Sequence, residues 1–519
     1  MVDAFLKKVP GYLLLLAMGG CTGQLGSPGE EQNCETVAEP RRVLRLGARE
    51  LIQATSSVAP FEQGEVPAQL RQLARRERSD SKLVVTKELH QAVDGLARTL
   101  AEKLSTWPDQ CSGFGSEDSC TSTVLSQLEI RLLRSAQDAE AHTSLIELVR
   151  GVAQRSGPIV AWTTAVRAVA LSPKSFYLTE GMVGTDGELT GQETDLRGRE
   201  LANFLSFRLL GRPASEELVQ ALGSSSLEEE KLEEILETQF GDAGVGELTQ
   251  SFLESWLRVR EISLLSRPAD KQPGVDDAFL AALEQETREN LQSLSSAPVL
   301  ELRDLLTAPH RSALLGDREG PGERPGVFAL PGVIAASSSN THTNIPRRGR
   351  FLLKSLLCQE LPNPPPGAVG ETPPLREGAS ERERFEGVAS KTRCRGCHVV
   401  LDPLAYPFEV YDEVGRARVT DEHGNSIDTS GAHETQAGAK FEYTDINELM
   451  AQLADDPTVQ SCVVRRVSEH ILRRNIDSSA NSCASSAAPA NGAKSLDLLK
   501  ASRAVLVRSA AASRGEVKK

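Results

Sequence analysis

Aromatic side chains are scarce in this sequence: Phe, Trp and Tyr together make up only 4% of its 519 residues. Apolar residues of every kind reach 39%, which is enough for several helical cores joined by long polar connections. The formal net charge is −14, and no basic stripe with interleaved aromatic residues interrupts this acidic composition. An acidic surface repels phosphate backbones, so these features argue against a nucleic-acid partner.

The sequence signatures of common hydrolases and nucleotide-binding enzymes are also missing. The chain has no Gly-Xaa-Ser-Xaa-Gly elbow, no P-loop and no zinc-protease motif. The polar stretch from Ser337 to Asn340 indicates a loop rather than a nucleophile site. Whether the chain is an enzyme therefore stays open, and an electron carrier or a binding protein is favoured over a hydrolase.

Long hydrophobic runs are absent, apart from one short run at the N-terminus. Residues 11–20 follow Lys7 and Lys8 and are too few to cross a bilayer, which needs about 20 apolar residues. They suit the apolar region of a signal peptide. The run ends in Met18-Gly19-Gly20-Cys21, which resembles the lipobox of bacterial lipoproteins. That resemblance implies cleavage before Cys21 and acylation of its thiol, whereas an ordinary secretory signal with an incidental cysteine is the alternative.

A lipoprotein of this kind is exported and is held to a membrane only by its lipid. Thr22 follows the acylated cysteine, and it is not the Asp that is associated with retention in the inner membrane. The outer membrane is therefore favoured, with either a periplasmic or a surface-exposed protein.

Export changes how the nine cysteines are interpreted, because thiols outside the cytosol tend to pair. Setting aside Cys21 for lipid and Cys394 and Cys397 for a motif described below leaves an even number, and six cysteines allow fifteen connectivities. Cys111–Cys120 and Cys462–Cys483 are the favoured pairs, because each closes a short polar segment. Cys34–Cys358 then follows by elimination.

Helical periodicity dominates the chain from Arg41 onward. Leu89, Val93, Leu96 and Leu100 recur at three- and four-residue spacing, which places them on one buried helix face. The Gly- and Pro-rich residues 316–349 predict mostly loop, and the apolar residues after 493 could form one last helix. The predicted segments are a signal peptide (1–20), a tether (21–40), two helical domains (41–180 and 190–310), a Gly/Pro-rich connector with a short helix (311–375), a motif-bearing module (376–440), a C-terminal helical module (441–485) and a tail (486–519).

The motif is Cys-Xaa-Xaa-Cys-His (CxxCH), formed by Cys394, Cys397 and His398. Two thiols one helical turn apart can add to the two vinyl groups on one edge of a porphyrin, and the adjacent imidazole then serves as the proximal iron ligand. This spacing is the signature of covalent haem c attachment. Attachment takes place after export, which agrees with the signal peptide. The sequence thus predicts one covalent haem c, with His398 on the iron.

Three other interpretations of the motif compete. A thioredoxin-like redox pair belongs in a βαβ unit, and no alternation of strands and helices is apparent. A zinc site needs further ligands, usually from a second Cys or His pair, and the chain has no second C-x-x-C. A thiol pair with a purely structural role is the third interpretation.

The sequence around the motif resembles a family of cytochrome c-like multidomain proteins of unknown function, found in planctomycetes and myxobacteria. The family pattern is approximately C-x-x-C-H-x-x-M-D-P-x-G-F-x-x-E-x-F-D-x-x-G-x-x-R, followed by I-D-x-S-G. The chain departs from it at Leu401, where Met is common, at Ala405, where Gly is common, and mildly at Tyr406 and Tyr411. It matches at Cys394, Cys397, His398, Asp402, Pro403, Glu409, Asp412, Gly415, Arg418, Ile427, Asp428, Ser430 and Gly431.

The resemblance extends over roughly residues 120 to 485. It includes the segment TNIPRRGRFLLKSLLCQELPNPPPG, and it places Cys462 and Cys483 like the cysteines of the family's last module. It implies a mainly α fold of multi-helix domains, with a loop-rich, cytochrome c-like haem segment near the C-terminus. It implies no substrate.

The sixth iron ligand is open, since Leu401 replaces the common Met, and a five-coordinate iron is a further alternative. Met450 is a weak candidate, because it belongs to a helical apolar stripe and core packing is favoured for it. His423 and His433 are alternatives in segments that indicate solvated loops. The acidic residues Asp402, Glu409 and Asp412 are expected to bind Arg416 and Arg418 or to cap turns, not to act as acids or bases.

Taken together, these features predict an exported lipoprotein that carries one haem c and exchanges electrons with an unknown redox partner. The alternative is a non-redox binding or scaffold lipoprotein in which the CxxCH segment is structural. A haem enzyme such as a peroxidase is the third and weaker interpretation.

Overall fold

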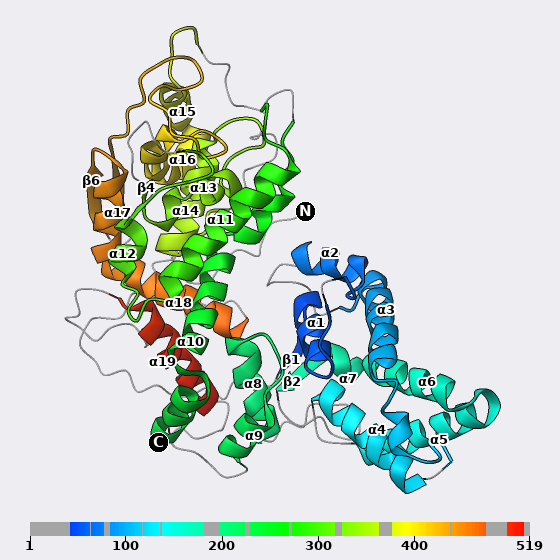
Figure 1. The fold of residues 1–519 in the computed structure, drawn as a ribbon. Coiled ribbons are helices and arrows are strands. Elements are labelled where there is room, and N and C mark those ends of the chain that lie inside the picture. Colours follow the sequence, from blue (N-terminus) through cyan, green and yellow to red (C-terminus); the bar gives the residue numbers. More distant parts are fainter. Residues whose placement is uncertain are drawn as a thin grey trace, which may run out of the picture. The chain divides into compact units, whose positions relative to one another are not determined.

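The computed structural model describes residues 42–512, except for 63, 77–83, 117, 135–137, 181–197, 224–228, 269–271, 317–323, 363–375, 436–437 and 474–495. The described residues all belong to the unit Thr36–Lys519. They are mainly helical, as predicted, and their strands form three two-stranded antiparallel sheets (Figure 1). Within them, no helix combines the length and the apolar character needed to cross a membrane. The predicted signal peptide, the tether, Cys21, Cys34 and Cys483 lie outside the described residues.

Along the chain, the N-terminal helices fall between the two strands of one sheet. β1 (Arg42–Arg45) pairs with β2 (Tyr177–Glu180), so a strand stands where helical periodicity was expected to begin at Arg41. Four residues are too few to separate a strand from a helix by pattern alone. The elements between the strands are α1 (Ala48–Ser56), α2 (Ala68–Arg76), α3 (Lys87–Lys103), η1 (Pro108–Gln110), α4 (Asp118–Leu133), α5 (Ala139–Ser156), α6 (Pro158–Ala170) and α7 (Pro173–Phe176).

Helix α3 shows how the sequence forms these elements. The side-chain oxygen of Thr86 accepts a hydrogen bond from the N–H of Leu89, which caps the first turn. The four apolar residues predicted to share a face are all buried. The helix ends at Lys103, before Pro108.

A second group of helices follows residue 197. Gly241 interrupts the long helix α10, because its φ of 56° is a left-handed conformation that glycine adopts without strain. The elements are α8 (Arg199–Leu209), α9 (Glu216–Leu222), α10 (Glu229–Trp256), η2 (Val259–Leu264), α11 (Asp277–Ser295), α12 (Leu302–Thr307) and β3 (Pro309–His310).

The C-terminal elements share one large apolar cluster with α8–α12. The cluster draws residues from Leu201 to Ala510, so it crosses several of the predicted segments. The elements are β4 (Arg324–Pro325), η3 (Val327–Ala329), α13 (Pro331–Ala336), α14 (Ile345–Leu357), α15 (Glu381–Ala389), α16 (Thr392–Ala405), η5 (Tyr406–Val410), β5 (Gly431–Glu434), β6 (Lys440–Tyr443), α17 (Ile446–Asp455), α18 (Pro457–Leu472) and α19 (Leu498–Ala512).

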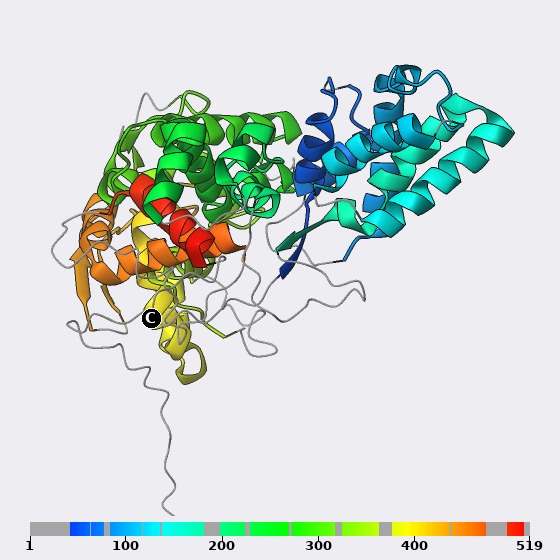
Figure 2. The same ribbon diagram turned by 90° about the horizontal axis from the view of Figure 1, so that it is seen from below.

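Two segments differ from the expectation for loops and tails. The Gly- and Pro-rich stretch contains η3 and α13, and all residues from Arg324 to Ala336 are buried, so the expectation of mostly loop was wrong there. The predicted last helix is confirmed as α19, but it is a core element, because it packs against α10 and α18 (Figure 2). Ser502 and Val505 have no exposed surface. Apolar content decided the structure of both segments more than their Gly, Pro or Ser did.

Candidate functional site

Helix α16 brings the three motif residues to one face. Cys394, Cys397 and His398 occupy positions i, i+3 and i+4, which are neighbours on a helix surface. Both thiols are free and half-buried. The structure therefore has two unpaired thiols about one turn apart, with an imidazole beside them.

The C-terminal half of α16 makes the core contacts. It packs beside α14 and α15 (Figure 1), and its buried apolar residues are Leu401, Leu404 and Ala405. At Gly349 of α14 the two helices approach so closely that a Cβ atom would lie 1.9 Å from the carbonyl oxygen of Leu401. Only glycine fits this approach. The motif lies in the half of the helix that the core does not use.

His398 is held by a buried carboxylate one turn further along. Its Nδ1 lies 2.8 Å from Oδ2 of Asp402, and its ring stacks on Phe385 with 6.2 Å between the ring centroids. In the neutral imidazole, a carboxylate acceptor at Nδ1 places the proton on that nitrogen and leaves Nε2 with its lone pair. One fifth of the His398 side chain is exposed. The imidazole is therefore not enclosed on every side.

Asp402 is almost wholly buried, with 1% of its side chain exposed. Burial raises its pKa, and the hydrogen bond from His398 opposes that change. Its other oxygen, Oδ1, has no hydrogen-bond partner in the part of the chain that the structure describes. We expected Asp402 to bind an arginine or to cap a turn, and this was wrong. The four-residue spacing from His398 along one helix was the signal that could have identified the pair.

Glu409 and Asp412 behave as expected. Oε2 of Glu409 accepts a hydrogen bond from Arg418 at 3.0 Å. Oδ1 of Asp412 accepts from the backbone N–H groups of Val414 and Arg416, so it caps a turn. Both carboxylates have structural roles in the segment that follows α16.

A buried arginine from α14 ties this segment together. Arg348 is 1% exposed, and its guanidinium donates to Oε1 of Glu409 at 2.8 Å. Its remaining acceptors are Ser338 Oγ and the carbonyl oxygens of Phe408, Tyr411 and Asp412. The sequence analysis did not identify Arg348 as a functional residue. The network fixes the segment after the motif to α14.

The candidates for a sixth ligand are placed differently from one another. Met450 has no exposed surface and belongs to the main apolar cluster, which agrees with core packing. His423 lies in a loop, with Nε2 3.5 Å from Glu381. His433 was expected to be solvated, and this was wrong: it is 3% exposed and stacks on Phe441. Burial lowers the pKa of His433, and the backbone of Val400 offsets part of that effect.

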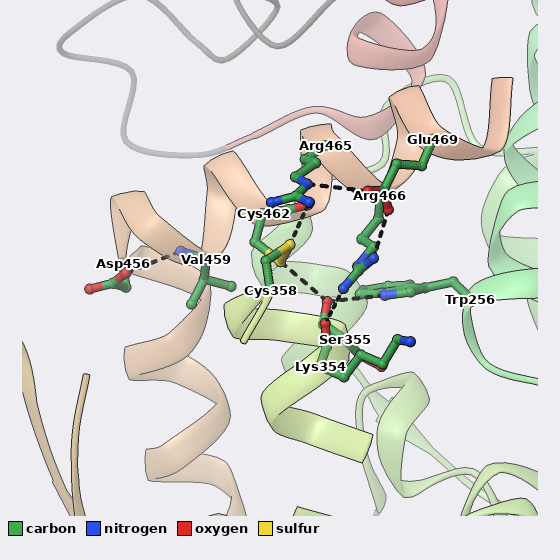
Figure 3. The surroundings of a disulfide bond; sticks show 10 residues. All are labelled: Trp256, Lys354, Ser355, Cys358, Asp456, Val459, Cys462, Arg465, Arg466 and Glu469. Atoms are coloured by element: carbon green, nitrogen blue, oxygen red, sulfur yellow. Dashed lines mark hydrogen bonds and ion pairs between the residues drawn. A yellow bond between two sulfur atoms is a disulfide. The ribbon is translucent and has the colours of Figure 1, made fainter. Parts of the chain in front are cut away.

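Two disulfides are formed by the described cysteines. Cys111–Cys120 is confirmed. The predicted partners of Cys358 and Cys462 were wrong, because these two residues are bonded to each other across 104 residues (Figure 3). Cys358 ends α14, Cys462 lies inside α18, and the two helices pack together. The preference for short loops failed here because packed helices bring distant cysteines close.

The surroundings of this disulfide are well bonded. Trp256 donates its indole N–H to the carbonyl oxygen of Ser355, and Arg466 donates to the carbonyl oxygen of Lys354 (Figure 3). The last turn of α14 is therefore attached to both α10 and α18. In the described part of the chain, no group of three or more His, Cys, Asp or Glu side chains could hold a metal ion.

Two parts of the chain match sequence families. Residues 196–313 match PSD4, a protein of unknown function (DUF1592). Residues 324–421 match PSCyt3, a protein of unknown function (DUF1588). The regions similar to DUF1592 and DUF1588 follow one another along the chain. No curated protein and no solved structure shows significant similarity to the chain.

The match to DUF1588 contains the CxxCH motif and the residues that hold it. It runs from β4 through α16 and η5. It therefore includes the CxxCH face, the His398–Asp402 pair and Arg348 with its acceptors. The DUF1592 match covers α8 to α12 and β3, and these elements contribute to the apolar cluster beneath the DUF1588 elements.

Proposed function

We propose that the chain carries one haem c, bonded through thioethers to Cys394 and Cys397 with His398 as the proximal ligand, and that it transfers electrons. The observation that carries the proposal is the single face of α16, where two free thiols and a partly exposed imidazole are neighbours. The cytochrome-related name PSCyt3, given to the family that matches this part of the chain, supports it.

The protonation of the imidazole fits an iron ligand. A ligating histidine commonly donates its second N–H to a carboxylate, which fixes the ring and raises the basicity of the ligating nitrogen. Asp402 is placed to do this through Nδ1, which leaves Nε2 for the iron. Oδ1 of Asp402 is buried without a described partner, so the carboxylate directs its one hydrogen bond at His398.

The bound haem would supply a one-electron couple between ferric and ferrous iron. The chain's own residues would attach, orient and tune it. Cys394 and Cys397 fasten the macrocycle to a rigid helix, Asp402 holds the imidazole, and the contact between Gly349 and Leu401 fixes α16 against α14. A site on a fixed helix changes little in geometry when an electron arrives, which suits electron transfer.

The test is haem attachment in a host that has cytochrome c assembly machinery. The wild-type protein should give a haem-stained band on a denaturing gel and the pyridine haemochrome spectrum of haem c. The Cys394→Ser/Cys397→Ser variant should lose the stain, and Cys111→Ser/Cys120→Ser should keep it. Intact wild-type protein without a stained band would reject haem attachment.

In that outcome the alternative would be favoured, namely a non-redox scaffold in which the CxxCH segment is structural. The geometry supports this alternative less well. The two thiols are unpaired, and other residues make the core contacts of α16.

We also propose that Cys21 carries a lipid that anchors the exported protein to the outer membrane. The basis is the sequence alone, since residue 21 lies outside the described residues. Labelling with a radioactive fatty acid should mark the wild-type protein and leave Cys21→Ser unlabelled. Label that survives in Cys21→Ser would contradict the proposal.

A further inference from the structure

Three cations frame the motif face of α16. Lys391, Arg393 and Arg395 are all exposed, and we call them the basic cluster. Arg393 and Arg395 stand four and three positions before Cys397 and His398, so these pairs are neighbours on the helix surface. Lys391 is the N-cap residue of α16, and its carbonyl oxygen accepts a hydrogen bond from the N–H of Cys394.

The acidic residues of the adjacent helix α15 are already paired locally. Glu381 binds Arg384 at 2.8 Å, and Glu386 binds Arg382 at 2.9 Å. Glu383 accepts from the backbone N–H of Ser380 in a capping box. With three glutamates and two arginines, α15 contributes a net charge of only −1 beside the basic cluster.

The basic cluster contrasts with the acidic composition of the chain. Three positive charges occur within five residues of a chain whose formal net charge is −14. The N-terminus of α16 adds a partial positive charge at the same place. Val399, which is 48% exposed, provides an apolar surface on the same helix. Exposed charges around an apolar contact are typical of interfaces that steer a partner before docking.

We propose that the basic cluster docks an acidic redox protein and steers it toward the haem. The inference rests on the proposed haem attachment and adds the class of partner. One electron is exchanged between the haem iron and the one-electron centre of the partner, so one is reduced as the other is oxidised. No bond forms or breaks, and no proton moves. The attachment cysteines alternate with the cations along the chain, so the attached edge of the haem is held close to the docking charges.

The first test measures electron transfer to small reagents by stopped-flow spectroscopy across a range of ionic strength. The reagents are anionic hexacyanoferrate and cationic hexaammineruthenium. The variant is Lys391→Glu/Arg393→Glu/Arg395→Glu. The control is Lys87→Glu/Lys231→Glu/Lys500→Glu, which changes the net charge equally at exposed lysines of other helices.

With hexacyanoferrate at low ionic strength, the variant should react at least about tenfold more slowly than wild type, and the control should stay within about twofold. Added salt should slow the wild-type reaction, because screening weakens the attraction. With hexaammineruthenium the variant should react faster than wild type. Equal rates for wild type and variant with both reagents would overturn the proposal.

The second test needs no haem, so it separates this proposal from haem attachment. Fluorescent poly-glutamate should bind wild type at low salt, as measured by anisotropy, and bind the variant at least about tenfold more weakly. Binding by protein that fails to stain for haem would reject haem attachment and keep the docking surface. If the protein stains for haem but the variant binds poly-glutamate as tightly as wild type does, the docking surface is rejected.

Vesicles of phosphatidylglycerol and phosphatidylcholine distinguish a lipid surface from an acidic protein. Cosedimentation should be the same for wild type and the cluster variant. Loss of vesicle binding in the variant, with poly-glutamate binding unchanged, would overturn the proposal in favour of a membrane surface.

Discussion

At the scale of single residues, the proposed function depends most on the hydrogen bond between His398 and Asp402. It fixes the tautomer of the imidazole and places a buried carboxylate behind it. A negative charge held close to a metal stabilises the more positive oxidation state. Asp402 therefore acts through His398, as a positioning residue.

Asp402→Asn should raise the midpoint potential of the bound haem. Asn can still accept the hydrogen bond from Nδ1, but it removes the negative charge that favours ferric iron. At a fixed applied potential, we expect the ratio of oxidised to reduced protein to change at least tenfold. For one electron this corresponds to a shift of about 59 mV in the midpoint potential. Spectroelectrochemical titration measures the potential.

Asp428→Asn is the matched control, because Asp428 is exposed and paired with Arg382. It removes the same charge outside the site and should leave the potential within a few millivolts of wild type. A haem-loaded Asp402→Asn protein with the wild-type potential would exclude a tuning role for Asp402.

Gly349 tests the close approach of α14 and α16. A Cβ atom there would overlap the carbonyl oxygen of Leu401, so Gly349→Ala should lower the free energy of unfolding by about 1–3 kcal/mol. Gly387→Ala in α15 is the control, because its Cβ would meet no atom within 4 Å. The control should be neutral or stabilised by up to about 1 kcal/mol. Urea unfolding measures both, and equal stability of the two variants would contradict this packing.

At the scale of elements, cysteine pairing and apolar runs decide how the C-terminal helices are joined. The disulfide between Cys358 and Cys462 connects the end of α14 to α18, and these helices lie on the same apolar cluster as α19. Helix α14 therefore holds α16 through Gly349, the following segment through Arg348, and α18 through a covalent bond. It is the element on which the site depends most.

Removing the long-range disulfide should cost more stability than removing the short one. The entropy of loop closure gives about 4–5 kcal/mol for a loop of 104 residues and about 3 kcal/mol for one of 9. Cys358→Ser/Cys462→Ser should therefore unfold at lower denaturant concentration than Cys111→Ser/Cys120→Ser. The opposite order in guanidinium unfolding would show that strain or residual structure outweighs loop length.

At the scale of the whole molecule, buried histidines make stability depend on pH. Burial lowers the pKa of His310 and His433. For His470, burial is the main cause and the positive charge of nearby arginines adds to it, so that its pKa falls to about 3. The arginines are Arg473, Arg260 and Arg208. An unfolded histidine has a pKa of about 6.5, so the unfolded chain binds more protons at lower pH. The stabilisation present above pH 6.5 is therefore lost as the pH falls.

Lowering the pH from 7 to 5 should reduce the free energy of unfolding, with His470 alone contributing on the order of 1 kcal/mol. His470→Gln should flatten the dependence of the melting temperature on pH over this range, whatever its effect at pH 7. Calorimetry at several pH values measures the slope. A slope unchanged in His470→Gln would show that other groups cause it.

The sequence predicted those parts of the molecule that follow from local pattern. Leu89, Val93, Leu96 and Leu100 have helical periodicity, and they are buried on one face of α3. The spacing of the CxxCH motif likewise places its three residues on one face of α16 once that segment is helical. These features need only the residues of one helix.

Features that join distant segments could not be predicted in this way. The partner of Cys462 depends on the packing of α14 against α18. The burial of Arg348 depends on carbonyl groups some 60 residues away. His433 appeared to lie in a solvated loop because its neighbours are polar, but its strand packs on α16. Each depends on which elements meet in the fold, and a single sequence carries little information on that.

The long-range disulfide also has a consequence for biosynthesis. Its two cysteines enclose the segment that contains Cys394 and Cys397, so four thiols would emerge on one stretch of chain in the proposed export. Oxidation must join the outer two, whereas thioether formation needs the inner two reduced. An oxidant acting indiscriminately could couple an inner thiol to an outer one and block both reactions. For the proposed haem attachment, α14 and α18 would have to meet early, or a reductant would have to keep the inner pair available until the porphyrin is delivered.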